Sequence, residues 1–398
     1  MLKRKLKLVA ITLMLAAIQV FFYIPTTAVA NYTTAVRYAN TDFSFENSDI
    51  VVDIIRKAEW LEDIIDSTCA VVSGPYYKYS IKGEIGLELD YAVYNLIFTN
   101  GKKGIIKLGV PNKHNGFGGS GKIVDDESPE FISEPYVLIG DEDIVYSVTE
   151  NNVERVNFTS VTNLSTAQDK IVASVVSKVG KQLYEISNPV TISMSLLRTK
   201  ALLMGVLDET EPSEHGTDVP IVHQSDDGQY VDCHLACVAA VVKTREPVLY
   251  SELDAFDVHD AFEEIDPYSI SLDFTTIEEI RDLMHEAYLG DDQGHISYLC
   301  DKRYPETIPE YQFKSFIDNG TILLSIFGGE TDFGSEPDRF HAIVMCKYRE
   351  YSNGDILGLC MDPWNDCYQI LDWNDDGFLK YDFGSQEIIY LESIINYT

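Results

Sequence analysis

The chain has 398 residues, of which 45% are hydrophobic and 24% are charged, a composition typical of globular proteins. Its 64 acidic residues outnumber the 30 basic ones, and the formal net charge is −34. So strong a negative charge repels nucleic acid and anionic membrane surfaces, and we predict neither as a partner. The length is typical of two domains.

The seven cysteines are unevenly distributed, since Cys69 lies far upstream and the others fall in the C-terminal half. They are too sparse for a disulfide scaffold, and their spacings do not fit a tetrahedral zinc site. We therefore predict no metal and no cofactor. Because the number is odd, at least one thiol stays unpaired in any internal disulfide scheme, which directs attention to a reactive thiol.

The first thirty residues have the pattern of a secretory signal. Basic residues precede an apolar run over residues 8–24, and Ala28, Val29 and Ala30 supply the small-x-small pattern that signal peptidase cuts. We therefore predict cleavage near Ala30 and a secreted, extracellular mature chain without membrane contact. An uncleaved membrane anchor is the alternative, because the apolar run approaches the length of a transmembrane span.

Residues 31–207 mix helical and strand-like patterns. Apolar side chains recur at helical spacing from Asp49, which predicts an amphipathic helix. Asn100 and Gly101 tolerate the positive φ of a type I′ turn and predict a hairpin. Helices combined with an antiparallel sheet predict an α+β domain. Strand-like runs cover residues 77–81, 91–99, 104–110, 136–139, 144–148 and 153–158, and further helices are predicted at about 166–183 and 193–207.

Residues 208–218 read DETEPSEHGTD, an acidic stretch that contains Pro and Gly but no apolar anchor. We predict an exposed linker here, of the kind that proteases cut. It would separate an upstream domain, residues 31–207, from a downstream domain, residues 219–398.

The downstream domain opens with a segment that indicates an activated cysteine. Small and apolar residues follow Cys233 as far as Val242 and predict a buried helix, with Asp232 and Cys233 at its start. A thiol at a helix N-terminus meets the positive end of the helix dipole and unpaired N–H groups, both of which favour the thiolate. With a histidine partner, such a cysteine can act as a nucleophile near neutral pH.

This segment resembles the papain-like cysteine peptidases of bacteria. A VPIVHQ stretch ends in Gln224, and after a short spacer the helix is similar to the pattern D-C-G-x-A-C-L-A-M-x-L-K of the double-glycine-leader (bacteriocin-processing) peptidases. The departure is His234, where those families carry Gly or Trp, and this side chain either crowds the oxyanion site or points outward. The matching residues are Asp232, Cys233, Ala236, Cys237, Ala239 and Lys243.

Two later motifs occur in the order that these peptidases use. His341 opens a strand-like run after a Gly-rich loop. Asp362, Pro363 and Trp364 follow another strand-like run and resemble the turn whose first residue orients the catalytic histidine. The resemblance covers residues 219–398 and implies an α+β, papain-like catalytic domain, built from a helix and an antiparallel, barrel-like sheet.

The resemblance implies a role for each of these residues. The Cys233 thiolate attacks a peptide carbonyl and forms a thioester, while His341 protonates the leaving amine and later serves as base for the hydrolytic water. Asp362 orients His341, and Gln224 stabilises the oxyanion together with the backbone N–H of Cys233. We therefore expect a secreted cysteine endopeptidase that acts on peptide or protein substrates.

Alternatives remain open at several of these positions. An alignment to the streptococcal exported proteinase selects Cys237 as the nucleophile, and only the helix register favours Cys233. Gln229 competes with Gln224, whose spacing to Cys233 is longer than usual. Asp362 has the alternative of merely starting a turn before proline.

Residues 372–377 match the opening of a calcium loop but are followed by Phe383 where the loop requires Glu. We prefer a tight hairpin turn at this place.

The order of signal, α+β domain, acidic linker and catalytic domain resembles exported staphylococcal and streptococcal proteinases. This resemblance implies that residues 31–207 are a prosegment that inhibits the enzyme intramolecularly and that the protein is made as a zymogen. A binding or anchoring module is the competing interpretation of this region. For the whole chain, a thiol amidase acting on cell-wall peptides and a catalytically inactive, papain-like adhesion protein also stay open.

Overall fold

The structure is a computed structural model. It describes residues 36–37, 42–82, 86–109, 118–125, 128, 131, 137–141, 144–148, 153–157, 160–162, 189–207, 210–226, 229–271, 276–290, 295–299, 310–319, 322–329, 339–364, 367–372, 381–383, 386–388 and 390–397. The predicted signal, the predicted helix at 166–183 and most of the calcium-like stretch lie outside these residues. Within them, no helix has both the length and the apolar character needed to cross a membrane.

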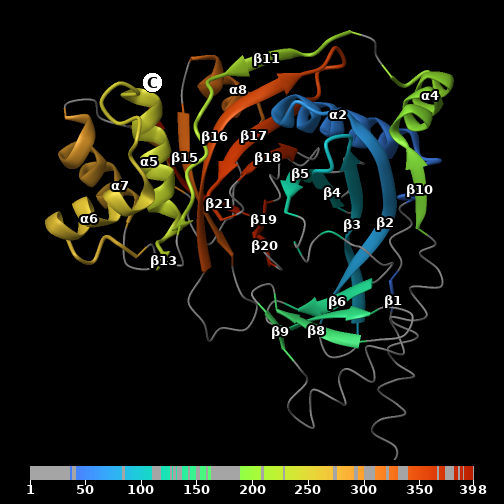
Figure 1. Cartoon of the computed structure of the whole chain (residues 1–398), viewed down its shortest axis with the longest axis horizontal. Coiled ribbons are helices and arrows are strands. Elements are labelled where there is room, and N and C mark those ends of the chain that lie inside the picture. The colour runs from blue at the N-terminus through green and yellow to red at the C-terminus, as the bar shows by residue number, and fades with distance from the viewer. Residues whose placement is uncertain are drawn as a thin grey trace, which may run out of the picture. The chain divides into compact units, whose positions relative to one another are not determined.

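Helices and mainly antiparallel strands make up the structure, in agreement with the α+β class expected from the sequence (Figure 1). The chain divides into two compact units. The smaller unit comprises Met1–Thr41, Tyr77–Asp90 and Glu134–Asn188, and the larger one comprises Asp42–Tyr76, Tyr91–Ser133 and Pro189–Thr398. This division differs from the boundary expected at residues 208–218, because segments from both sides of that stretch belong to the larger unit.

The smaller unit contains a strand meander. Its strands pair antiparallel in the order β6 (Val137–Asp141), β7 (Ile144–Val148), β8 (Val153–Asn157) and β9 (Ser160–Thr162). Two parallel pairings complete it, β6 with residues 78–80 of β2 (Cys69–Lys82) and β1 (Val36–Arg37) with the start of β3 (Gly86–Phe98).

The larger unit begins with the amphipathic helix α2 (Ser48–Ile65). Asn47 caps its start by accepting a hydrogen bond from the N–H of Asp49, and Asp66 ends it in the left-handed conformation at φ 48°. Its apolar face is fully buried, and burial of this kind stabilises most helices in proteins more than intrinsic propensity does. The buried apolar residues are Ile50, Val51, Ile54, Ile55, Ala58, Trp60 and Leu61.

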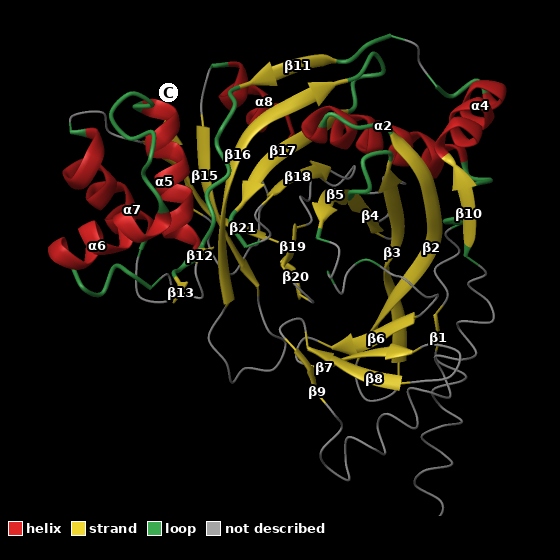
Figure 2. Ribbon diagram, in the orientation of Figure 1, coloured by secondary structure: helices red, strands yellow, loops and turns green. Residues whose placement is uncertain are grey.

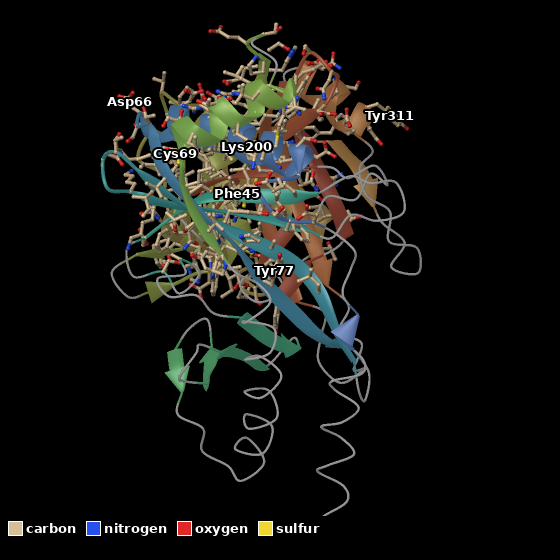
Figure 3. The ribbon with its side chains drawn as sticks, turned by 90° about the vertical axis from the view of Figure 1, so that its right-hand side faces the viewer. Phe45, Asp66, Cys69, Tyr77, Lys200 and Tyr311 are labelled. Carbon is tan, nitrogen blue, oxygen red and sulfur yellow. The ribbon has the colours of Figure 1, made fainter. Side chains whose placement is uncertain are left out.

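Helix α2 packs on strands that follow it closely in the chain, including β4 (Lys103–Gly109) and β5 (Gly119–Val124). The predicted hairpin between β3 and β4 is confirmed, since Ile97 pairs with Lys103 and Gly101 has a φ of 87°. Helix α4 (Met194–Met204) follows β10 (Val190–Ser193) and contacts α2. There Lys200 Nζ lies 2.5 Å from Glu46 Oε1, and Figure 3 shows Lys200 on this face of the unit.

An antiparallel sheet forms the centre of the larger unit (Figure 2). After β18 (Cys367–Asp372), the last of its C-terminal strands, the sheet continues with β5, where Gln369 pairs with Lys122. Strands from both sides of the expected linker are therefore joined in one sheet. Its neighbouring strands are, in order, β14 (His295–Leu299), β21 (Tyr390–Tyr397), β15 (Ile322–Gly329), β16 (Arg339–Glu350), β17 (Ile356–Asp362) and β18 (Cys367–Asp372).

A group of helices lies beside β15 and β16 (Figure 1). Its central member, α5 (Cys233–Arg245), has only buried residues from Cys233 to Val242, as expected for a helix that is apolar on every side. The group also contains α6 (Ala255–Ile265), α7 (Ile277–Met284) and the π-helical turn η1 (His285–Leu289), and the hairpin of β12 (Ser225–Asp226) and β13 (Gln229–Tyr230) precedes α5 in the chain. Helix α8 (Glu310–Asp318) contacts β16, and the pair of β19 (Tyr381–Phe383) and β20 (Gln386–Ile388) contacts β5 and β15.

The segment predicted as an exposed linker contains a strand, β11 (Ser213–Gly216), which pairs with the last residues of β16. Charge holds it there, because Lys347 and Arg349 both bond to Glu214, at 3.0 and 2.9 Å. Gly216 has a φ of 113°, and a Cβ at this position would lie 2.2 Å from the carbonyl oxygen of Cys346. The acidic composition that indicated a linker therefore serves in part to dock the segment on a basic strand.

Candidate active site

Cys233 lies at the first position of α5, directly after its N-cap Asp232. Its side chain is 8% exposed, whereas the following residues of the helix are fully buried. The first N–H groups of a helix have no partner within the helix, so they face the region of the Cys233 sulfur. The backbone N–H of Ala342 donates to Cys233 Sγ over 3.1 Å, which ties the start of α5 to the start of β16.

His341 sits in β16 opposite Phe327 of β15, one residue before the donor to Cys233. Its Nε2 lies 3.0 Å from Oδ1 of Asp362, and both side chains are completely buried. This bond leaves Nδ1 as the ring nitrogen that can exchange a proton with Cys233. The order of thiol, imidazole and carboxylate is therefore present in space as well as in sequence.

The surroundings of His341 favour its charged form. Burial alone would lower its pKa, but the negative charges of Cys233 and Asp362 and hydrogen bonds with both groups together raise the pKa to about 9. At neutral pH the imidazole is therefore protonated, and it lies between the sulfur of Cys233 and the carboxyl group of Asp362.

Asp362 ends β17 and begins the turn through Pro363. Its Oδ1 accepts the bond from His341 and another from the backbone N–H of Trp364 at 2.9 Å. Its Oδ2 accepts a hydrogen bond from Nε2 of Gln369 in β18. The two interpretations of Asp362 from the sequence thus describe one arrangement, because the same carboxylate caps the turn and contacts the histidine.

Gln224 is buried, with an exposed fraction of 3%. Its backbone N–H donates to the carbonyl of Pro363 at 3.4 Å, and its own carbonyl accepts from Val231 at 2.9 Å. Gln224 therefore lies between the turn that follows Asp362 and the segment that leads into Cys233. The β12–β13 hairpin between Gln224 and Val231 takes up the extra residues that lengthen its spacing to Cys233. The competing Gln229 belongs to this hairpin.

Cys237 is placed differently from Cys233. It lies one turn into α5 and is fully buried, and burial is the main cause that raises its pKa well above the usual value. Such a thiol stays neutral and unreactive. The geometry therefore favours Cys233 as the nucleophile, the same residue that the helix register favours.

The departure at His234 has a structural explanation. Its side chain is buried rather than turned outward, and Nε2 lies 2.9 Å from the backbone carbonyl of Ser269, so this ring nitrogen carries the hydrogen. Burial also lowers its pKa, which keeps the ring neutral. The side chain is thus held by the segment after α6.

Sequence reasoning missed two groups of this site. The N–H of Ala342 is a backbone donor, and no residue type signals its position. Gln369 is a side-chain donor whose role depends on the register of β17 and β18, in which Cys360 pairs with Gln369 and Asp362 pairs with Cys367. Residues that are diagonal neighbours across antiparallel strands share a face, which brings Gln369 to Asp362.

Among the described residues, one group has the spacing of metal ligands, namely His259, Asp260 and Glu263 on α6. Both carboxylates are exposed, and nothing else in the surroundings indicates an ion. In the calcium-like stretch Asp372 is described, and its carboxylate bonds to Lys57 Nζ at 2.8 Å. No protein-family model matches the chain, and a search of curated proteins finds no match.

Proposed function

We propose that this chain is a papain-like cysteine peptidase with Cys233 as nucleophile, His341 as acid and base, and Asp362 as the group that orients His341. The observation that carries the proposal is the buried contact of the three groups: Cys233 at the start of α5 is bound by Ala342 N–H, and the adjacent His341 bonds to Asp362. A thiol next to an imidazolium that a carboxylate holds in place is the arrangement nucleophilic cysteine catalysis requires.

In the first step, the Cys233 thiolate adds to the carbonyl carbon of the scissile peptide bond and forms a tetrahedral oxyanion. His341 then gives its Nδ1 proton to the leaving amine, the C–N bond breaks, and a thioester remains on Cys233. His341 is now neutral and removes a proton from water, which attacks the thioester. Collapse of the second tetrahedral intermediate releases the acid and restores the thiolate and imidazolium.

The oxyanion needs hydrogen-bond donors at the start of α5. The backbone N–H of Cys233 points from the helix N-terminus, and the proposed second donor is the side-chain amide of Gln224, which is buried between the Asp362 turn and the segment before Cys233. Loss of one such donor lowers kcat by about 10²–10³ in a comparable site.

We also propose that residues 31–207 act as a prosegment in a secreted zymogen. Charged contacts that connect α2 to two strands and a turn of the downstream part support this role: Lys57 bonds to Asp372 of β18, Arg349 of β16 to Asp63 at 2.7 Å, and Arg56 to Asp355 of the β16–β17 turn at 2.7 Å. The accessible place for activating cleavage is the stretch before Ser213, because β11 itself is paired with β16.

The test is active-site labelling of the chain without its predicted signal, before and after limited proteolysis ahead of Ser213. A thiol-epoxide inhibitor should modify Cys233 alone, and Cys233→Ala should abolish hydrolysis of denatured casein. The matched variant Cys237→Ala should retain hydrolysis and labelling. Labelling of Cys237, or none before and after cleavage, would overturn the assignment.

Two further outcomes discriminate between the functions that the sequence leaves open. Release of peptides from purified cell wall without cleavage of casein would identify a thiol amidase. Full activity of the uncleaved chain would exclude inhibition by residues 31–207 but would leave the peptidase assignment intact.

A further inference from the structure

The carboxylate behind His341 is the most heavily hydrogen-bonded group of the site. Asp362 is completely buried, and its two oxygens accept from three different elements: His341 in β16, the N–H of Trp364 in the turn, and Gln369 in β18. A buried carboxylate stays ionised only when donors replace the water it has lost. Gln369 donates to Oδ2, whereas His341 and the N–H of Trp364 donate to Oδ1.

Burial and backbone pairing hold Gln369 in position for this contact. Its side chain is 1% exposed, and its backbone is paired on both sides, with Cys360 of β17 and with Lys122 of β5. A glutamine held in the centre of a sheet has little freedom to leave its partner. Its amide is also neutral, so it supplies a donor without adding a second cation that would compete with His341 for the carboxylate.

From this geometry we infer that Gln369 is a positioning residue for the proposed peptidase reaction, which keeps Asp362 ionised and so supports the imidazolium of His341 beside Cys233. The predicted effect of Gln369 on the rate of peptide hydrolysis rests on the proposed function. The effect of Gln369 on the charge of His341 and on the reactivity of Cys233 can be observed without a substrate.

The other titratable groups around Asp362 do not replace this donor. Cys360 and Cys237 are buried nearby, and burial raises the pKa of each well above the usual value, so both stay neutral and contribute no charge. Cys233 and His341 form the pair that Asp362 supports. With Gln369 removed, the buried Asp362 loses the hydrogen bond that β18 supplies to its ionised form, which favours uptake of a proton and loss of the negative charge next to His341.

The experiment compares Gln369→Met with Gln369→Glu in the full chain without its predicted signal. Methionine keeps most of the buried volume and removes the donor, so the fold is preserved while Oδ2 loses its partner. A carboxyl at this position donates only while it holds a proton, and two adjacent carboxyls share one proton, so its donor role depends on pH. Gln312→Met on the half-buried surface of α8 is the matched control, and circular dichroism checks folding of every variant.

The first readout is alkylation of Cys233 by iodoacetamide, quantified by mass spectrometry as the ratio of the rates at pH 6 and pH 9.5. Iodoacetamide reacts with the thiolate, so the rate at the lower pH reports how far the neighbouring His341 imidazolium supports the reactive form of the thiol. We expect this ratio to fall at least about 10-fold in Gln369→Met, the effect of losing one hydrogen bond to a charged group. Gln369→Glu should keep a ratio nearer that of the wild type, because its proton is retained at pH 6, and Gln312→Met should be unchanged.

The second readout is the pH profile of kcat/KM for peptide hydrolysis, measured after limited proteolysis ahead of Ser213 because the uncleaved chain is the proposed zymogen. Gln369→Met should lose roughly 10- to 100-fold, mainly in kcat. Gln369→Glu should lose little at acidic pH and progressively more as the pH rises, a pattern that a merely structural role would not produce. Unchanged alkylation and hydrolysis in a folded Gln369→Met variant would overturn the inference. An altered alkylation ratio in a chain that hydrolyses no peptide either before or after cleavage ahead of Ser213 would support the inference and contradict the proposed function.

Discussion

Two ion clusters, one completely buried and one partly buried, lie at the ends of neighbouring strands and differ in the cation they contain. At the end of β17, Asp362 bonds to His341, a group whose proton can be given away near neutral pH. At the end of β18, Asp372 bonds to Lys57 of α2, with Asp53 nearby. Burial alone would lower the pKa of Lys57, but Asp372 and Asp53 raise it, so the ammonium keeps its charge.

The difference indicates what each cluster does. A transferable proton next to a thiol suits catalysis, whereas a permanent charge that joins two distant parts of the chain suits docking. The clusters are linked through β18, which carries both Asp372 and Gln369, the donor to Asp362. Substitutions in each cluster therefore test whether proton transfer at His341 and the attachment of α2 to the sheet are independent of each other.

The largest expected effect is from Lys57→Met. The substitution leaves Asp372 and Asp53 without the cation that neutralises them, and removing one partner of a buried ion pair destabilises by about 3–5 kcal/mol. Urea unfolding at pH 7 measures the change in free energy of unfolding. The exposed Lys102→Met is the control and should change it by less than about 0.5 kcal/mol. A loss below about 1 kcal/mol for Lys57→Met would show that the pair does not hold α2 in place.

The second effect is the pH dependence that His341 gives to stability. Its pKa is about 9 in the folded chain and about 6.5 when unfolded, so folding favours the protonated form. The stabilisation is complete below about pH 6.5 and is lost as the pH rises through 9, with an upper limit of about 3 kcal/mol. Unfolding at pH 6 and pH 10 should show a larger loss for the wild type than for His341→Gln. Equal losses in both proteins would contradict the ion pair.

The smallest effect concerns Asp53. Desolvation is the main cause that raises the pKa of Asp53, against the lowering effect of Lys57, and the resulting value is about 7. Its ionised form is therefore disfavoured in the folded chain, and the cost appears between about pH 4 and pH 7. Asp53→Asn should leave the free energy of unfolding nearly unchanged at pH 4 and increase it at pH 8 by about 1 kcal/mol. The increase is this small because the side chain is partly exposed to water, which screens its charge. A stability gain that is equal at both pH values would point to another cause.

The sequence predicts local features of this protein well because they depend on residues close together in the chain. The apolar spacing after Asp49 identifies α2, and Asn100 with Gly101 identifies the hairpin between β3 and β4. Cys233 at the start of a small-residue helix and Asp362 before proline are likewise local patterns, and the structure brings both residues to His341.

Long-range pairings have no comparable signal. The pairing of β5 with β18 joins residues about 250 positions apart, which no periodicity indicates, and it is the reason that the compact units differ from the expected domains. The contact of Gln369 with Asp362 requires the register of two strands, since a shift of one residue would turn Gln369 to the opposite face. The strand β11 was not predicted, because the acidic composition of its segment is also typical of a linker.

The pairing of β5 with β18 also bears on the fate of the chain after cleavage. Without β5, the N–H and C=O groups of β18 that face β5 would lose their partners, and β18 would become an exposed edge of the sheet to which a strand of another chain could pair. Exposed edges favour aggregation and the exchange of strands between copies. If the upstream part stays bound after a cut ahead of Ser213, β5 still covers this edge, so the two halves are expected to remain associated.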